Sequence, residues 1–430
     1  MQPWPGEVLE ERAGEIAAGF AALVTRQAAW RHRRVETITV LSHEQVRRHV
    51  SVDFTVPVEH RDDVRLSDTE WVVPLALLAK RPLVHFDLRS EDESAVPLLR
   101  SDEAQLISRE LLYLALDLDA EGGDDSPRGL ASLGPVAQGA PGPATTSYGT
   151  DQAAPLIEWI LAAGAGESAA IDAAVAELEE QLGPLPGFAA LASHLASGFL
   201  LCAVLNDVTK RRVIKFAYDE PLARPGRWAH FYDAPGCTEA ASYHAEVDVP
   251  DELRARTTEM IDDFTGVVLA TGPRDADRPA IHYVADAGAR VDPGLSVRYG
   301  TERGRFLVPA ALVAWVISLG LALPWLFADL GSLATSGGPA IAVLLSSSAL
   351  FSGLVLRSGE HPLVRLVLAP YRLCLAAATV AAVVAGGALA FRASSEMLEI
   401  TWGVGALVAI LAASILTVEA ARAPAAARDR

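Results

Sequence analysis

Apolar residues gather near the C-terminal end of the chain in four long stretches that carry no charge through their middles. A helix rises about 1.5 Å per residue, so roughly 20 residues cross a hydrocarbon core of about 30 Å. Peptide groups in lipid must be hydrogen-bonded within the segment, which favours helices over strands here. The pattern therefore predicts a C-terminal four-helix transmembrane bundle. Its expected spans are 306–328, 337–356, 373–391 and 400–418.

Arginines cluster on one side of these expected spans, and positively charged short loops stay in the cytoplasm. Three arginines precede the first span, three lie between the second and third, and three follow the fourth, whereas the other side has only Arg392. We therefore expect a multi-pass protein of the cell inner (plasma) membrane with cytoplasmic N- and C-termini and a tail at 421–430. Small residues also recur at every fourth position of each span, which lets helices approach closely.

Ahead of the spans, the hydrophobic pattern alternates between the periods of a helix and of a strand. Residues 6–29 place Leu9, Ile16, Phe20 and Leu23 on one helical face, which predicts a docking helix. From Val35 the period becomes two, and segments 35–41 and 46–56 predict a hairpin. In the second of these segments Val46, Arg48, Val50, Val52 and Phe54 share one side.

The rest of the head contains many short strands and a few amphipathic helices. Strands are expected at 71–79, 82–89, 198–205, 211–219, 228–232, 242–249, 265–270, 280–285 and 294–299, and helices at 102–116, 153–163, 167–182 and 187–197. Such strands, separated by Gly, Pro and Asp, are typical of antiparallel sheets. We expect an α+β soluble head with predominantly antiparallel, sandwich-like β structure, divided into 1–120, a flexible Gly/Pro/Ala/Ser linker at 121–150, and 151–305.

Charge narrows the possible partners of the head. Residues 1–305 carry 29 basic and 48 acidic residues, near −19, and this field repels the phosphates of nucleic acid. We expect the lipid bilayer, a protein partner or a second copy as partners, and no nucleic acid. Arginine outnumbers lysine by 33 to 3, a bias of GC-rich coding that resembles membrane proteins of GC-rich bacteria.

Candidate catalytic residues are few and weak. The three cysteines show no paired spacing, as in a reduced compartment. Cys237 follows Pro-Gly and has His230 and His244 seven residues to either side, so a thiol and a base lie near each other in sequence. The same two histidines, with Glu246 and His282, are possible zinc ligands.

A second metal hypothesis rests on Asp117, Asp119 and Glu121, which match the opening of a calcium loop. The match stops at position twelve of that loop, where Arg128 stands in place of the bidentate Glu. We therefore predict no metal and no cofactor, and the sequence has no phosphate-binding loop, dinucleotide fingerprint, His-Glu-x-x-His or Gly-x-Ser-x-Gly.

These observations favour an integral membrane protein with an acidic cytoplasmic β-rich binding head of unknown ligand, and not an enzyme. Two alternatives remain open. The first is a membrane-disrupting or pore-forming effector that is triggered by oligomerisation of the head. The second is a membrane-proximal enzyme that uses Cys237 and His244.

Overall fold

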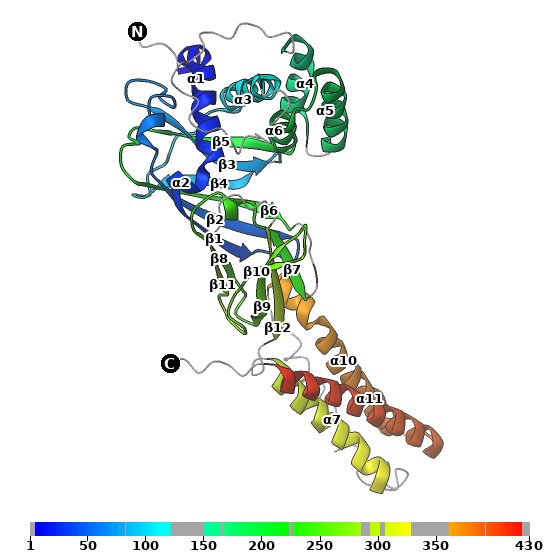
Figure 1. The fold of residues 1–430 in the computed structure, drawn as a ribbon. Coiled ribbons are helices and arrows are strands. Elements are labelled where there is room, and N and C mark those ends of the chain that lie inside the picture. The colour runs from blue at the N-terminus through cyan, green and yellow to red at the C-terminus, as the bar shows by residue number, and fades with distance from the viewer. Residues whose placement is uncertain are drawn as a thin grey trace.

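The protein is elongated, with a helix-covered end far from three long apolar helices (Figure 1). The computed structural model describes residues 5–81, 83–121, 150–164, 167–222, 226, 228–284, 293–301, 306–327, 361–391 and 393–423. The expected linker lies outside these residues except for Glu121 and Thr150 at its two ends. The expected second span, 337–356, also lies outside them.

The centre of the head is a six-stranded sheet. Its strand order is β11 (Ala280–Tyr283), β8 (Tyr243–Asp248), β1 (Arg31–Val40), β2 (Gln45–Phe54), β6 (Arg212–Pro221) and β4 (Val84–Ser90). All neighbours are antiparallel except β1 and β8, which run parallel. The predicted hairpin is confirmed by β1 and β2, and the buried side of β2 consists of the residues that its alternation assigns to one face.

Two smaller sheets complete the described part of the head. The four-stranded sheet has the order β10 (Val268–Thr271), β9 (Leu253–Asp262), β12 (Pro293–Thr301) and β7 (Ala229–Asp233). The two-stranded sheet pairs β3 (Trp71–Ala79) with β5 (Gly198–Leu205). The α+β class with mostly antiparallel sheets is confirmed, and a sandwich of two sheets stays a prediction. Strand β9 was missed, because Arg254 and Arg256 interrupt its apolar alternation.

The helices of the head cover the end that is distant from the apolar helices. They are α1 (Pro5–Thr25), α2 (Gln27–Trp30), α3 (Ser101–Glu121), α4 (Thr150–Ala162), α5 (Ser168–Leu182) and α6 (Pro186–Ser197), with the short 3₁₀ helix η1 (Val58–His60). A second 3₁₀ helix, η3 (Pro235–Thr238), contributes Cys237 to the core shared with the apolar helices. Helix α1 buries Leu9, Ile16 and Phe20 in the same apolar core as Val50 and Phe54 of β2, which confirms the predicted docking face.

The C-terminal helices are α7 (Val308–Phe327), α10 (Pro362–Ala390) and α11 (Ser395–Arg422). Each is long and apolar enough to cross a bilayer. Helices α10 and α11 extend beyond the predicted spans 373–391 and 400–418, because these spans follow the uncharged stretches, whereas the helices continue through charged residues such as Arg365 and Glu396. The N-terminus of α10 is fixed by His361, whose Nδ1 accepts a hydrogen bond from the Leu363 N–H at 3.2 Å.

Small residues line the contacts among these three helices. Ala310, Ala314 and Ser318 of α7 are buried, as are Gly405, Ala409 and Ala413 of α11. Helix α11 runs antiparallel to both neighbours. Trp315 Nε1 of α7 donates to Thr417 Oγ1, while Trp325 of α7 lies beside Gly403. Trp402 Nε1 of α11 donates to the Ala385 carbonyl of α10, while the Tyr371 hydroxyl of α10 donates to Glu419. Helices α7 and α10 therefore run in the same direction, away from the head.

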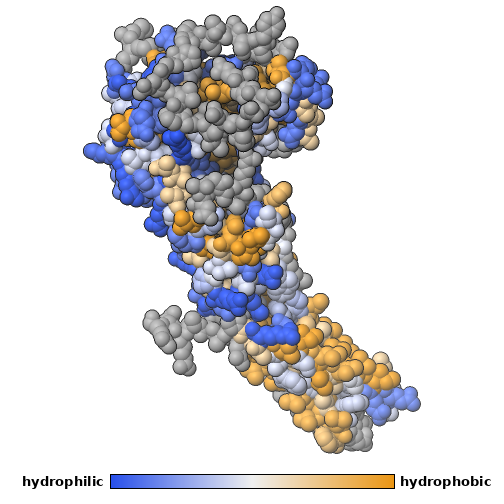
Figure 2. Space-filling view, viewed as in Figure 1, coloured by the Kyte–Doolittle hydropathy of each residue, from blue (hydrophilic) through white to orange (hydrophobic). Residues whose placement is uncertain are grey.

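The head and the apolar helices share one hydrophobic core. A single cluster of buried side chains contains Val247 of β8, Leu295 of β12, Ala310 of α7 and Val364 of α10. In Figure 2 the exposed apolar surface is concentrated on these helices, while the head is mostly hydrophilic. The head thus packs on the helices rather than being joined to them by chain alone.

Candidate functional site

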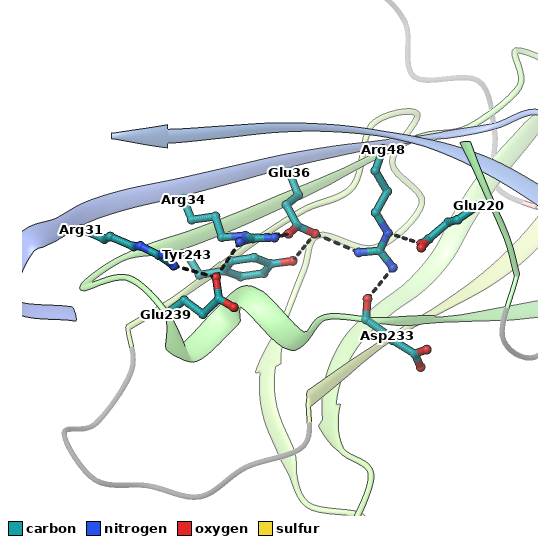
Figure 3. A network of polar contacts seen from close by, with 8 residues as sticks. All are labelled: Arg31, Arg34, Glu36, Arg48, Glu220, Asp233, Glu239 and Tyr243. Atoms are coloured by element: carbon teal, nitrogen blue, oxygen red, sulfur yellow. Dashed lines mark hydrogen bonds and ion pairs between the residues drawn. The ribbon is translucent and has the colours of Figure 1, made fainter. Parts of the chain in front are cut away.

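Charged side chains are buried where the sheets of the head meet. Glu36 of β1 is 0% exposed and accepts hydrogen bonds from Arg34 Nε at 2.8 Å, Arg48 Nη1 at 3.0 Å and the Tyr243 hydroxyl at 2.9 Å (Figure 3). These residues lie on the buried face of the six-stranded sheet, between an apolar cluster towards α1 and another towards the C-terminal apolar helices. The arrangement is a polar seam across an otherwise apolar face.

Two arginines of this network connect the central sheet to the other two sheets. Arg48 of β2 donates to Glu220 of β6 and to the carbonyl oxygen of Asp233, the last residue of β7 (Figure 3). Arg31 donates to Glu239 at 2.9 Å and to the Pro74 carbonyl of β3 at 2.9 Å. The network therefore ties the three sheets through charged hydrogen bonds, which are stronger than neutral ones.

Opposite charges keep the network ionised in spite of its burial. Burial alone raises the pKa of Glu36, but the guanidiniums of Arg34 and Arg48 outweigh it and hold that pKa below its ordinary value. Burial lowers the pKa of Arg31 to about 10, still well above neutral pH. The network thus forms ion pairs between three arginines and three glutamates: Arg31, Arg34 and Arg48 with Glu36, Glu220 and Glu239.

A glycine makes room for this network. A Cβ on Gly236 of η3 would lie 2.2 Å from Cζ of Arg34, so any other residue would displace the guanidinium. The glycine between Pro235 and Cys237 is therefore needed to leave space for the side chain of Arg34. Arg34 also bonds Glu239, one residue beyond η3, at 2.7 Å.

The opposite face of the six-stranded sheet, which we call the open face, is not covered by any described helix or strand. Strand register arranges its residues in two complete rows across the sheet. From β11 to β4 the first row is His282, His244, Val35, Ser51, Lys215 and Arg89, and the second row is Ala280, Glu246, Thr37, His49, Ala217 and Asp87. The central positions of both rows are uncharged, and the charges lie towards the flanks.

Ion pairs within the chain occupy the β4 side of the open face. Arg47 Nε lies 2.6 Å from Asp219 Oδ1, Arg89 Nε lies 2.7 Å from Asp87 Oδ2, and Lys215 pairs with Glu93. A shallow depression of about 340 Å³ lies beside these pairs, and its lining includes Thr37, His49, Ser51, Asp87, Arg89, Glu93 and Lys215. It offers hydroxyl and imidazole groups over a small apolar floor.

The three catalytic candidates lie in different environments. Cys237 is fully buried in the core, and burial raises the pKa of its thiol to about 12. His230 of β7 is also fully buried, with Nδ1 3.2 Å from the Tyr232 hydroxyl, and burial lowers its pKa to about 4. His244 belongs to the open face, on the other side of the central sheet from Cys237. This arrangement does not provide a thiolate next to a base.

The metal candidates are also separated. Within the described residues, no three His, Cys, Asp or Glu side chains gather as metal ligands. His282 lies opposite His244 and contacts Ser242 Oγ at 3.1 Å, whereas His230 lies in another sheet. Asp119 Oδ2 instead accepts a hydrogen bond at 2.8 Å from the Phe188 N–H near the start of α6, as a helix-capping carboxylate does. Asp117 precedes it on α3, and the side chain of Glu121 lies outside the described residues.

Sequence reasoning did not identify the buried charge network, although one signal was present. Arg48 stands among Val46, Val50 and Val52 on the apolar side of a predicted strand, and a charged residue at such a position requires a buried partner. Comparison of the sequence with protein-family models and with curated proteins finds no match.

Proposed function

We propose that the protein is an integral membrane protein whose acidic cytoplasmic head binds a protein partner through the open face, with the C-terminal helices as its anchor. The observation that carries this proposal is the charge of that face. Its strand residues include four basic side chains, Arg33, Arg47, Arg89 and Lys215, and five acidic ones, Asp53, Asp87, Asp219, Glu246 and Asp248. A nearly neutral face on a strongly acidic head is where another protein can approach without repulsion.

The direction of the helices supports the proposed anchor. Because α7 and α10 both run away from the head, residues 328–360 must join the far end of α7 to the head-proximal end of α10. A return crossing by the predicted span 337–356 satisfies this connection. With this span, both ends of the membrane part lie on the side of the head, which the arginine distribution assigns to the cytoplasm.

The shared core supports a role beyond tethering. Side chains of β12 and β8 pack in the same cluster as those of α7 and α10, so the head has a fixed orientation on its anchor. A fixed orientation presents the open face at a constant height above the bilayer. The pore-forming and enzymatic alternatives have no comparable support, because the small residues of α7 and α11 already pack within one chain and Cys237 is buried apart from His244.

Site-specific photo-crosslinking in native membranes tests the binding proposal. A photoreactive phenylalanine analogue at Thr37, on the open face, should give a protein adduct, whereas the same analogue at Asp172, exposed on α5, should not. Adducts of equal yield at both positions, or none at Thr37, would contradict the proposal. Carbonate extraction and protease treatment of intact cells test the anchor separately: the chain should stay in the membrane, and the head should be cleaved only after permeabilisation.

A further inference from the structure

We infer that the partner of the open face is a second copy of this chain, which makes the protein a homodimer in the membrane. This inference rests on the proposed function and specifies its partner. Three observations carry it: the orientation of the open face relative to the membrane, the distribution of its charges, and its area.

Strand β1, in the middle of the central sheet, runs from the far end of the head towards its membrane end. The carbonyl oxygen of Val40, at the end of β1, accepts a hydrogen bond at 2.9 Å from His361 Nε2 at the start of α10. The other end of β1 follows Trp30, which is buried in the cluster beneath α1. Because β1 runs towards α10, the open face points to the side of the head and not towards the apolar helices. Two copies anchored in one membrane can bring these faces together about a two-fold axis along the membrane normal.

Such an axis would pass between β1 and β2, the two middle strands of the sheet. The first row would then place Ser51 against Val35 of the second copy, and Lys215 against His244 of the second copy, close to its Glu246. The second row would place His49 against Thr37 of the second copy. The centre of the contact is thus uncharged, and Lys215 on one flank lies near Glu246 on the other, although the next row would place Asp219 against Asp248 of the second copy.

The area of the open face is sufficient for a stable contact. Six strands about 4.8 Å apart, the longest of ten residues rising about 3.3 Å each, cover on the order of 600–800 Å². Standard interfaces bury about 800 Å² per partner. Anchoring in the same membrane also raises the effective concentration of the two copies, so a modest intrinsic affinity suffices.

Cysteine crosslinking of the full chain in native membranes tests this inference. Cys202 and Cys237 are buried, so a Cys374→Ala background leaves no accessible native thiol within the described residues. In that background Ser51→Cys treated with a short bis-maleimide should give a product of twice the monomer mass that carries both of two co-expressed tags. Asp172→Cys, on the exposed surface of α5, should remain monomeric.

The possible results separate the two proposals. A Ser51→Cys product that contains another polypeptide would overturn the second-copy inference and leave the binding function standing. Absence of any product, with Ser51→Cys still labelled by a monofunctional maleimide, would overturn both.

Charge exchange provides a second test that is specific for two copies. Lys215→Glu should weaken dimerisation at least about tenfold, because it places like charges near each other across the interface. Adding Glu246→Lys should restore it. Residues 215 and 246 lie on β6 and β8, separated by β2 and β1 within one chain, so rescue must occur between copies. Arg100→Glu, the same change at an exposed position before α3, should have no effect. Equal weakening by Lys215→Glu and Arg100→Glu, or no rescue, would refute the arrangement.

Discussion

Removing the charge of Glu36 should destabilise the head strongly, because this carboxylate balances two buried guanidiniums. Glu36 is 0% exposed and bonds Arg34, Arg48 and Tyr243. In Glu36→Gln, three arginines of the network face only Glu220 and Glu239. Breaking a buried ion pair by removing one partner typically costs about 3–5 kcal/mol. For a domain of this size, each kcal/mol lowers Tm by about 2–4 °C, so Tm should fall by roughly 6–20 °C.

Thermal melting of the detergent-solubilised chain, followed by tryptophan fluorescence, measures this effect. Trp30 is a suitable reporter, since it is buried with its ring centroid 4.9 Å from Cζ of Arg31. Asp102→Asn removes the same charge at an exposed position of α3 and should change stability by less than about 0.5 kcal/mol. Adding Arg48→Gln to Glu36→Gln rebalances the charges and should recover part of the loss. A Glu36→Gln variant that melts within about 3 °C of the parent would refute the reasoning.

Three further predictions follow from the same geometry. The pKa of Glu36 in the folded protein lies below its ordinary value of 4.5, so the stabilising contribution of Glu36 is complete above pH 4.5 and is lost as the pH falls through the folded pKa. In that acid range Tm should therefore decline less steeply with falling pH for Glu36→Gln than for the parent. Asp119→Ala removes the cap of α6 and should cost about 1 kcal/mol in unfolding experiments, whereas calcium should not change the Tm of the parent. Cys237 should resist maleimide labelling in native membranes but react after denaturation, because its side chain is buried and its thiol pKa is raised to about 12; rapid labelling of the native protein would contradict this burial.

Local patterns were sufficient to predict much of the architecture. The alternation of Val46, Val50 and Phe54 specified both the strand β2 and its buried side, and the long uncharged stretches located α7, α10 and α11. These features depend on periods of 2 and 3.6 residues, which a single segment carries by itself. Strand β9 was lost because its interior includes Arg254 and Arg256, so its burial is imposed by β10 and β12 on either side.

The polar seam depends instead on residues that are far apart in the sequence. Arg34 and Glu239 are separated by 205 positions, and Arg48 and Glu220 by 172. No local pattern relates such pairs, and even the number of sheets is set by pairings between the two halves of the head, such as β3 with β5. Sequence reasoning therefore placed Arg48 on the apolar side of its strand but could not supply its partners.

The length of α10 explains why the head and its anchor should respond together. Its 29 residues span about 43 Å, whereas a hydrocarbon core is about 30 Å thick. The excess lies at the head end, where Leu363 and Val364 join the core of the head and His361 bonds the end of β1. Strand β1 also carries Glu36 on one face and Val35 and Thr37 on the other. If a partner binds the open face as proposed, it contacts the same strand that holds the buried charges and abuts α10, so binding and the position of α10 would be linked through β1.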